Sequence, residues 1–307
     1  MNMSGLIGKM LMLLFFIVIG ILCSKVRLID EHGSRVINKI VLYVCAPALV
    51  IWSVLNTELA YTAGDILRLL LFGILFNVLG LLIGWGCSWL LCRKQESRGT
   101  FHLVTAFGNI SFMGLPVIAS LYGNAAVFPA SICSLPFNLF IFSFGTMLAL
   151  GGRGEKLPWK RMLLNPALIA TVVALLIFFL GVPLPMPVND AISYLANMVI
   201  PLAMLLIGSS LSRMNARSVL LCGKFYGVCL SKLLITPIVM YLILKPLVRD
   251  PLTFGILVIM SAMPSATMAP VLCTEYGGDS EFANGSVFLS TILSLVTVPL
   301  VIWLLKL

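Results

Sequence analysis

Two apolar stretches of the chain contain residues that interrupt a helix. Residues 108–116 read GNISFMGLP, and residues 261–270 read SAMPSATMAP. Proline removes a backbone donor and clashes with the preceding turn, which costs about 3 kcal/mol in a helix interior, and glycine weakens a helix further. In hydrocarbon, interrupted backbone is tolerated only where it is buried in protein or lines a wet cavity. The two stretches therefore predict a pair of broken helices, although ordinary proline kinks are the alternative.

The two stretches occupy matching places in an internal repeat. A shift of 154 residues superposes Pro116 on Pro270 and the Tyr-Gly pair at 122–123 on the pair at 276–277. In the 23-residue window that ends at Gly123, seven positions are identical after the shift. Self-similarity at a fixed offset is the sequence signature of a repeat architecture. We expect two repeats, residues 1–153 and residues 154–307.

The composition is that of a chain solvated by lipid. Of the 307 residues, 60% are hydrophobic and 10% are charged, whereas soluble domains are about 45–50% apolar and about 25% charged. A soluble protein of this composition would expose apolar patches that drive aggregation. The composition excludes a cytosolic enzyme, a disulfide-stapled secreted domain and a disordered regulator.

Ten stretches are long and apolar enough to cross a bilayer, which takes about 20 helical residues. They are residues 4–23, 36–56, 64–92, 101–121, 125–150, 163–181, 190–211, 218–244, 253–273 and 284–305. Each repeat holds five spans, and because five is odd the second repeat must enter the membrane inverted. Inverted repeats are typical of secondary transporters, and a duplication kept only for stability is the alternative. The sequence predicts an all-α polytopic membrane protein of ten transmembrane helices in two inverted five-helix repeats.

The basic residues alternate between the loops. The loops after spans 1, 3, 5 and 7 carry 13 of the 20 lysines and arginines, and the loops after spans 2, 4 and 6 carry none. Cytoplasmic loops are enriched in Lys and Arg, so we expect a multi-pass protein of the cell (inner) membrane with both termini outside. Two loops disagree: the loop after span 8 holds Lys245 and Arg249, and the loop after span 9 holds only acids.

Few polar residues lie deep in the spans. Lys232 is the fifteenth residue of span 8, too deep to reach the membrane surface, and an intramembrane ionisable residue is a functional candidate by default. It could attract an anionic substrate, fill a place that other carriers give to a cation, or bond to backbone carbonyls. The repeat equivalent of Lys232 is position 78 in span 3, one position from Asn77. Asn77 and Lys232 could therefore be neighbours. Asn138 of span 5 lines a site or bonds to another helix.

Broken helices that meet near the midplane suit a carboxylate. They present the positive ends of half-helices, free N–H groups and polar side chains. We expect the following substrate-binding residues: Asn109, Ser111, Gly114, Pro116, Asn138, Ser265, Thr267, Pro270, Lys232 and Asn77.

Motifs for catalysis, metals or cofactors are absent from the sequence. It contains no His-Glu-x-x-His, no Gly-x4-Gly-Lys, no Gly-x-Ser-x-Gly, and no Asp or Glu deep within a span. We therefore expect no enzyme activity, no metal and no cofactor.

The chain resembles the auxin efflux carrier family over essentially its whole length. The matching segments are residues 108–116 with Tyr122-Gly123, Asn165-Pro166, residues 200–208, and residues 264–270 with Glu275-Tyr276. The family includes bacterial permeases for malate, malonate and similar acids and the plant PIN-FORMED auxin exporters, and it is related to the bile acid:sodium symporters. The short segment 151–161, in place of the long cytoplasmic loop of the large plant exporters, indicates a prokaryotic permease.

The resemblance implies a division of the fold and a mechanism. Helices 1, 2, 6 and 7 would form a scaffold that is often dimeric, and helices 3–5 and 8–10 a transport domain in which broken helices 4 and 9 cross. Asn109, Pro116 and Pro270 would be elements of the substrate site, with Asn138 at a polar position of span 5. The transport domain would slide against the scaffold like an elevator. The sodium-site carboxylates of the bile-acid relatives have no visible counterpart in this sequence.

Our leading hypothesis is a secondary transporter of small organic anions, mono- or dicarboxylates with auxin-like acids possible. Its expected partners are the organic acid, the lipid bilayer and a second copy bound through the scaffold helices, and we expect no nucleic acid. The alternative is a membrane-embedded organic-acid sensor that binds without transport.

Overall fold

The computed structural model describes residues 3–55, 61–92, 94–151, 185–213 and 219–305, with single residues and pairs between 169 and 180. In these ranges all regular structure is helical, apart from one isolated bridge between Gly108 and Ser265. The predicted span 163–181 and the Asn165-Pro166 segment lie almost wholly outside the described residues.

The described helices follow one another in this order: α1 (Met3–Lys25), α2 (Glu31–Ile40), η1 (Val41–Cys45), α3 (Ala46–Leu55), α4 (Ala63–Leu91), α5 (Arg98–Ala106), η2 (Ile110–Gly114), α6 (Leu115–Tyr122), η3 (Asn124–Ala126), α7 (Val127–Phe140), η4 (Ile141–Gly145), α8 (Thr146–Leu150), α11 (Met186–Asn197), α12 (Val199–Arg213), α14 (Lys224–Leu230), η5 (Ser231–Ile235), α15 (Thr236–Leu244), α16 (Pro251–Ala262), α17 (Met268–Tyr276) and α18 (Ser280–Leu305).

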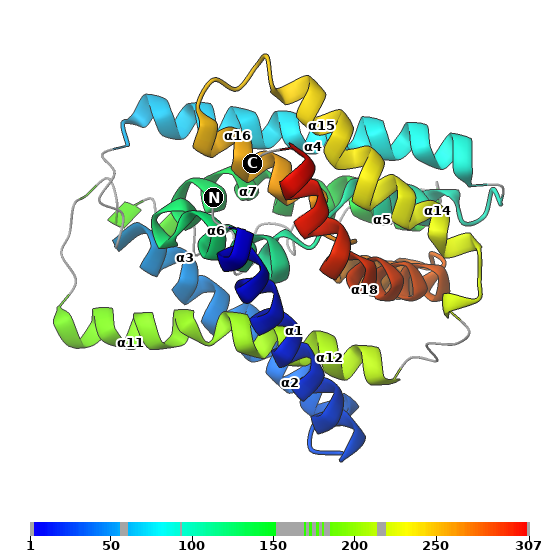
Figure 1. The fold of residues 1–307 in the computed structure, drawn as a ribbon, viewed down its shortest axis with the longest axis horizontal. Coiled ribbons are helices and arrows are strands. Elements are labelled where there is room, and N and C mark those ends of the chain that lie inside the picture. Colours follow the sequence, from blue (N-terminus) through cyan, green and yellow to red (C-terminus); the bar gives the residue numbers. More distant parts are fainter. Residues whose placement is uncertain are drawn as a thin grey trace.

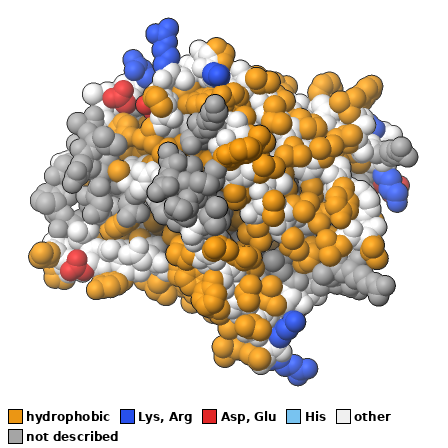
Figure 2. Space-filling model, in the orientation of Figure 1, with side chains coloured by type: hydrophobic (Ala, Val, Ile, Leu, Met, Phe, Trp, Pro, Cys, Tyr) orange, Lys and Arg blue, Asp and Glu red, His pale blue; other side chains and the backbone are white. Residues whose placement is uncertain are grey.

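Among the described residues, five helical stretches are long and apolar enough to cross a membrane. They are Ala63–Leu91, Val127–Leu150, Met186–Leu206, Lys224–Leu244 and Ser280–Leu305, and the shorter apolar helices are Leu14–Lys25 and Pro251–Ala262. Hydrophobic side chains cover much of the described part of the face in Figure 2, and charged side chains lie at its margins. An all-helical protein with several apolar spans is thus confirmed, and the full set of ten inverted helices stays a prediction.

The helices pack in two groups. In the first, α1 packs along α12 and α3 packs along α11; in the second, α4 packs against α5 and α7, and α18 against α14 and α17. In Figure 1, α11 and α12 run across the lower part of the view with α1 and α2 beside them, whereas α4, α15 and α16 lie in the upper part. The site described below is built by the second group.

The α1–α12 contact is a close approach of two backbones. A Cβ atom on Gly208 would overlap the carbonyl oxygen of Ile17, and one on Gly20 would overlap the carbonyl oxygen of Leu205. Small residues let helices in lipid approach in this way, since packing rather than the hydrophobic effect holds them together there. The two glycines therefore determine how closely these helices meet.

Three of the four described π-helical turns lie at the same distance before a proline. The turns η1, η2 and η5 each end two residues before Pro47, Pro116 and Pro237 respectively. Proline cannot donate to the carbonyl four residues back and clashes with it, so the helix widens there. Such π-bulges are frequent at functional sites, and two of these three hold predicted site residues.

The loops after predicted spans 3 and 9 meet at one end of the molecule. Ser97 Oγ donates to Asp279 Oδ2 at 2.7 Å, and the Asp279 amide donates to Thr100 Oγ1 at 3.2 Å. Lys224, near the start of predicted span 8, forms an ion pair with Glu281 at 3.5 Å. The acidic residues after span 9 thus interact with groups from the end of the molecule where the basic loops lie. These interactions explain why the loop after span 9 is acidic. The orientation of this end in the cell stays a prediction.

The Tyr-Gly pairs matched by the 154-residue shift each end a helix at a glycine of positive φ. Gly123 follows α6 with φ 85° and ψ 170°, and Gly277 follows α17 with φ 75° and ψ 23°. Both values of φ are positive, where a side chain strains the backbone. Both matched glycines thus follow a helix with a positive φ, and the two repeats stay a prediction.

We expect Gly123→Ala to destabilise the protein by about 1–3 kcal/mol, because its backbone lies in a region that essentially only glycine adopts. Gly277→Ala should cost less, about 1–2 kcal/mol, because its left-handed helical conformation is accessible to other residues. Thermal unfolding of the purified variants measures both. Gly86→Ala is the control, because nothing lies within 4 Å of a Cβ there; equal midpoints for all three variants would contradict the argument.

Candidate functional site

The two interrupted stretches cross as a short antiparallel pair. The Asn109 amide donates to the Pro264 carbonyl at 2.7 Å, and the Ala266 amide donates to the Phe107 carbonyl at 3.0 Å. Gly108 and Ser265 lie opposite each other between these bonds. Each broken segment thereby supplies the backbone partner that the other lacks, which is how unwound backbone is satisfied inside a membrane protein.

The breaks lie upstream of the prolines that predicted them. Helix α5 ends at Ala106, and α16 ends where Met263 turns extended (φ −65°, ψ 147°), the conformation favoured before a proline, here Pro264. Pro116 lies in the first turn of α6 and Pro270 in the first turn of α17. Proline is tolerated in a first turn, where its missing N–H has no helical partner. Pro270 thus lies in the first turn of its half-helix, whereas Pro116 follows η2 inside the half-helix that begins at Ile110.

Four helix ends converge on this crossing. The C-terminal ends of α5 and α16 enter it, and η2 and α17 leave it from Ile110 and Met268. Neither η2 nor α17 has an acidic residue in its first turn, and Thr267 precedes α17 without a side-chain cap bond. The exposed N–H groups and the positive ends of the half-helix dipoles make such starts suited to anions.

A row of serines from α18 faces the crossing. Ser290 Oγ accepts a hydrogen bond from the Ser265 amide at 3.2 Å. Ser286 and Ser294 lie one turn before and one turn after Ser290, and all three are buried. Reasoning from the sequence missed this row, although its spacing of four residues in an apolar span was a visible signal.

The Ser265 hydroxyl is a free polar group at the crossing. The residue is fully buried, and its Oγ has no hydrogen-bond partner among the described residues. A buried hydroxyl without a partner costs free energy. Such a group suits a ligand that is absent from the structure.

Lys232 reaches the crossing from η5. Its side chain is 1% exposed, and its Nζ lies 3.1 Å from the position that a Cβ on Gly108 would take. Among the described residues it forms no ion pair and no hydrogen bond through Nζ. Glycine at position 108 thus leaves the room that the ammonium group occupies.

Other predicted site residues lie nearby in the fold with different roles. Asn77 is buried in α4, and its Nδ2 donates to the Gly73 carbonyl of the same helix at 2.8 Å; no hydrogen bond joins it to Lys232. Gly114 faces the second stretch, since a Cβ there would lie 3.4 Å from Met263 Cγ. Ser111 and Asn138 belong to η2 and α7, and their side chains lie outside the described part of the structure.

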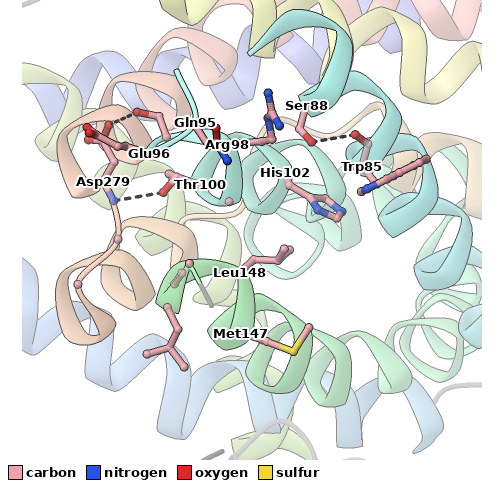
Figure 3. Close-up of a pocket in the computed structure, with 17 residues that line it drawn as sticks. Trp85, Ser88, Gln95, Glu96, Arg98, Thr100, His102, Met147, Leu148 and Asp279 are labelled. Atoms are coloured by element: carbon pink, nitrogen blue, oxygen red, sulfur yellow. Dashed lines mark hydrogen bonds between the residues drawn. The ribbon is translucent and has the colours of Figure 1, made fainter. Parts of the chain in front are cut away.

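A separate cavity of about 770 Å³ opens where the loops after spans 3 and 9 meet. Figure 3 shows its lining from α4, α5, α8 and the α17–α18 connection, with Trp85, Arg98, His102 and Asp279 among the labelled side chains. The His102 ring nitrogen Nε2 lies 2.8 Å from the Leu81 carbonyl. None of the predicted site residues lines this cavity. In the described residues no cluster of three or more His, Cys, Asp or Glu is placed to hold a metal ion.

Broken helices that cross inside a multi-pass helical membrane protein are typical of membrane transporters. The chain belongs to the family described as membrane transport protein, of the auxin efflux carrier type, whose model matches residues 6–158 and 153–302. The resemblance stated from the sequence motifs is thereby confirmed.

Named relatives cover nearly the whole chain. An uncharacterized transporter of Methanothermobacter thermautotrophicus is 28% identical over 98% of both chains. An uncharacterized transporter of Methanocaldococcus jannaschii is 26% identical over 96% of this chain and 97% of its own. A protein of Rhizobium meliloti named "Putative malonate transporter" is 26% identical over 99% of this chain and 97% of its own.

Proposed function

We propose that this protein is a secondary transporter that carries small organic anions, mono- or dicarboxylates, across the cell membrane. The observation that carries the proposal is the crossing itself: a buried ammonium, a buried hydroxyl without a described partner and two half-helix starts converge on one place. Positive and donor groups without an acid beside them favour a carboxylate. The name of the Rhizobium relative supports malonate as the first substrate to test.

Within this proposal the carboxylate binds at the crossing. Asn109, Ser111, Ser265 and Thr267 would donate hydrogen bonds to its oxygens, together with backbone amides in the first turns of the two half-helices. Lys232 would add positive potential behind the crossing backbone. Gly114, Pro116 and Pro270 would shape the half-helices, and Asn77 and Asn138 would line the site from neighbouring spans.

The movement that we propose is elevator-like alternating access. The group formed by α4–α8 and α14–α18 would be the transport domain, and the group formed by α1–α3, α11 and α12, with predicted span 6, the scaffold. Supporting this division, α12 contacts η2, so the crossing lies next to the scaffold group. The antiparallel direction of the two crossing segments fits inverted repeats. We further propose a homodimer through the scaffold and both termini outside.

Uptake of labelled malonate, malate, oxalate and indole-acetate into proteoliposomes tests the proposal. Each substrate is tested with no gradient, with a proton gradient and with a sodium gradient, which separates uniport, symport and exchange. We expect saturable uptake of at least one labelled acid, and we expect the same acid without label to compete with it. Absence of uptake of any organic acid would refute the proposed function, and saturable binding without uptake would favour the sensor instead.

A further inference from the structure

We propose that the Lys232 ammonium is the resident counter-cation of the crossing. It occupies the place at the helix ends that a bound metal cation such as Na⁺ would otherwise take, so that binding of an organic anion requires no metal cation. The consequence for flux rests on the proposed transport function, whereas the occupancy of the cation place does not.

The proposed cation place, at the C-terminal ends of α5 and α16, is rich in carbonyl oxygens. An α-helix leaves its last four carbonyls without helical partners, and two helices, α5 and α16, end at the crossing. No backbone hydrogen bond from another described residue reaches the carbonyls of Thr105 and Ala106 in α5, or those of Ser261 and Ala262 in α16. Both ends carry the negative pole of a helix dipole. Two such ends together attract a cation.

Lys232 is aimed at this place. A Cβ on Gly108 would lie 3.1 Å from Lys232 Nζ and 3.4 Å from the Met260 carbonyl oxygen in the last turn of α16. The turn η5 that bears the lysine contacts α5, α16 and α18. Gly108 has no side chain to exclude the ammonium, so the group lies directly against the crossing backbone.

No acid competes for this ammonium. Lys232 is buried and forms no ion pair with a described residue, and Asp and Glu are absent from the depths of every predicted span. A buried charge without a counter-charge is costly unless dipoles surround it. In transporters, unwound backbone carbonyls and C-terminal half-helix ends coordinate Na⁺. An ammonium has the same charge, and as part of the chain it stays in place through every cycle.

Removing the ammonium should therefore create a demand for a small cation. We compare the wild type with Lys232→Ala and Lys232→Met in buffers whose only cation is N-methylglucamine, Na⁺ or methylammonium. The matched control is Lys224→Ala, an exposed lysine of the same helical stretch that pairs with Glu281. The first measurement is the thermal unfolding midpoint of the detergent-purified proteins. The second is uptake of the transported acid in proteoliposomes.

The expected result is a cation dependence confined to the Lys232 variants. Na⁺ or methylammonium should raise the unfolding midpoint of Lys232→Ala, and leave the midpoints of the wild type and Lys224→Ala unchanged. Uptake by Lys232→Ala should fall at least tenfold in N-methylglucamine and recover at least fivefold in Na⁺ or methylammonium. Wild-type uptake should be the same in all three buffers. Lys232→Met keeps the apolar stem and shows whether lost packing alone explains the loss.

The inference would be wrong if no small cation changed the unfolding midpoint or uptake of Lys232→Ala, or if uptake by the wild type required Na⁺. It would also be wrong if both Lys232 variants failed to fold in all three buffers, which is the result expected of a purely structural lysine. A wild type that moves no organic acid refutes the proposed function instead. In that case the unfolding midpoints still decide whether Lys232 holds the place of a cation.

Discussion

Replacing Ser265 with alanine is expected to lower the rate of organic-anion uptake about 10- to 100-fold. A hydrogen bond to a charged group contributes about 1.5–3 kcal/mol, and each 1.4 kcal/mol is about a factor of ten. Ser265 Oγ is buried at the crossing without a partner among the described residues, so a bound carboxylate is the partner that we propose for it. Uptake of the labelled acid in proteoliposomes measures the effect.

The stability of the same variant separates a binding role from a structural one. Removing a buried hydroxyl that lacks a partner should leave the thermal midpoint unchanged or raise it. Ser294→Ala is the matched control, because Ser294 is also buried on this serine row but donates to the Thr291 carbonyl of its own helix at 2.7 Å. It should keep wild-type uptake. Uptake by Ser265→Ala within twofold of the wild type would remove Ser265 from the proposed site.

Gly208→Leu is expected to prevent the first helix group from forming. Any Cβ on Gly208 overlaps the Ile17 carbonyl oxygen and lies 2.9 Å from the Ile21 amide nitrogen, and rigid backbone cannot yield as a side-chain tip can. Overpacking costs about 1–3 kcal/mol where neighbours adjust; here α1 must separate from α12, so we expect a larger loss. The yield of monodisperse protein and its unfolding midpoint report the result.

The opposite side of this contact supplies a second variant. Gly20→Leu should act in the same way, because its Cβ would overlap the Leu205 carbonyl on α12. Gly86→Leu on α4, where a Cβ meets nothing within 4 Å, should behave like the wild type. If Gly208→Leu folded with the midpoint of Gly86→Leu, the close α1–α12 approach would be wrong.

The broken helices show both the reach and the limit of sequence reasoning. Glycine and proline in residues 108–116 and 261–270 predicted two interruptions, and both occur. Their positions differ, because the chain unwinds upstream of both Pro116 and Pro270. Pro270 falls in the first turn of its half-helix, where proline is tolerated, and Pro116 follows η2 inside the other half-helix. Local composition shows that a helix cannot continue, but not which neighbouring segment supplies the replacement hydrogen bonds.

The candidate site shows the same division. Lys232 was found from its depth in a span, and the structure places it against Gly108, the first residue of the interrupted stretch 108–116. The repeat suggested that Asn77 and Lys232 could be neighbours, but no hydrogen bond joins them, since the Asn77 amide donates within its own helix. An amide that can reach its own backbone does so locally, and no pattern in the sequence reveals that choice.

By itself, the sequence determined that lipid solvates this chain, that its spans are helical, and that two of them break at related places. These properties depend on composition and on neighbours along the chain, where apolar length and missing donors act directly. The tertiary structure alone decided that the two breaks pair as antiparallel backbone, that serines of α18 face them, and that the Lys232 ammonium fills the space above Gly108. Those contacts join residues up to 159 positions apart, from Phe107 to Ala266, and arise only when packing brings separate helices within hydrogen-bonding distance.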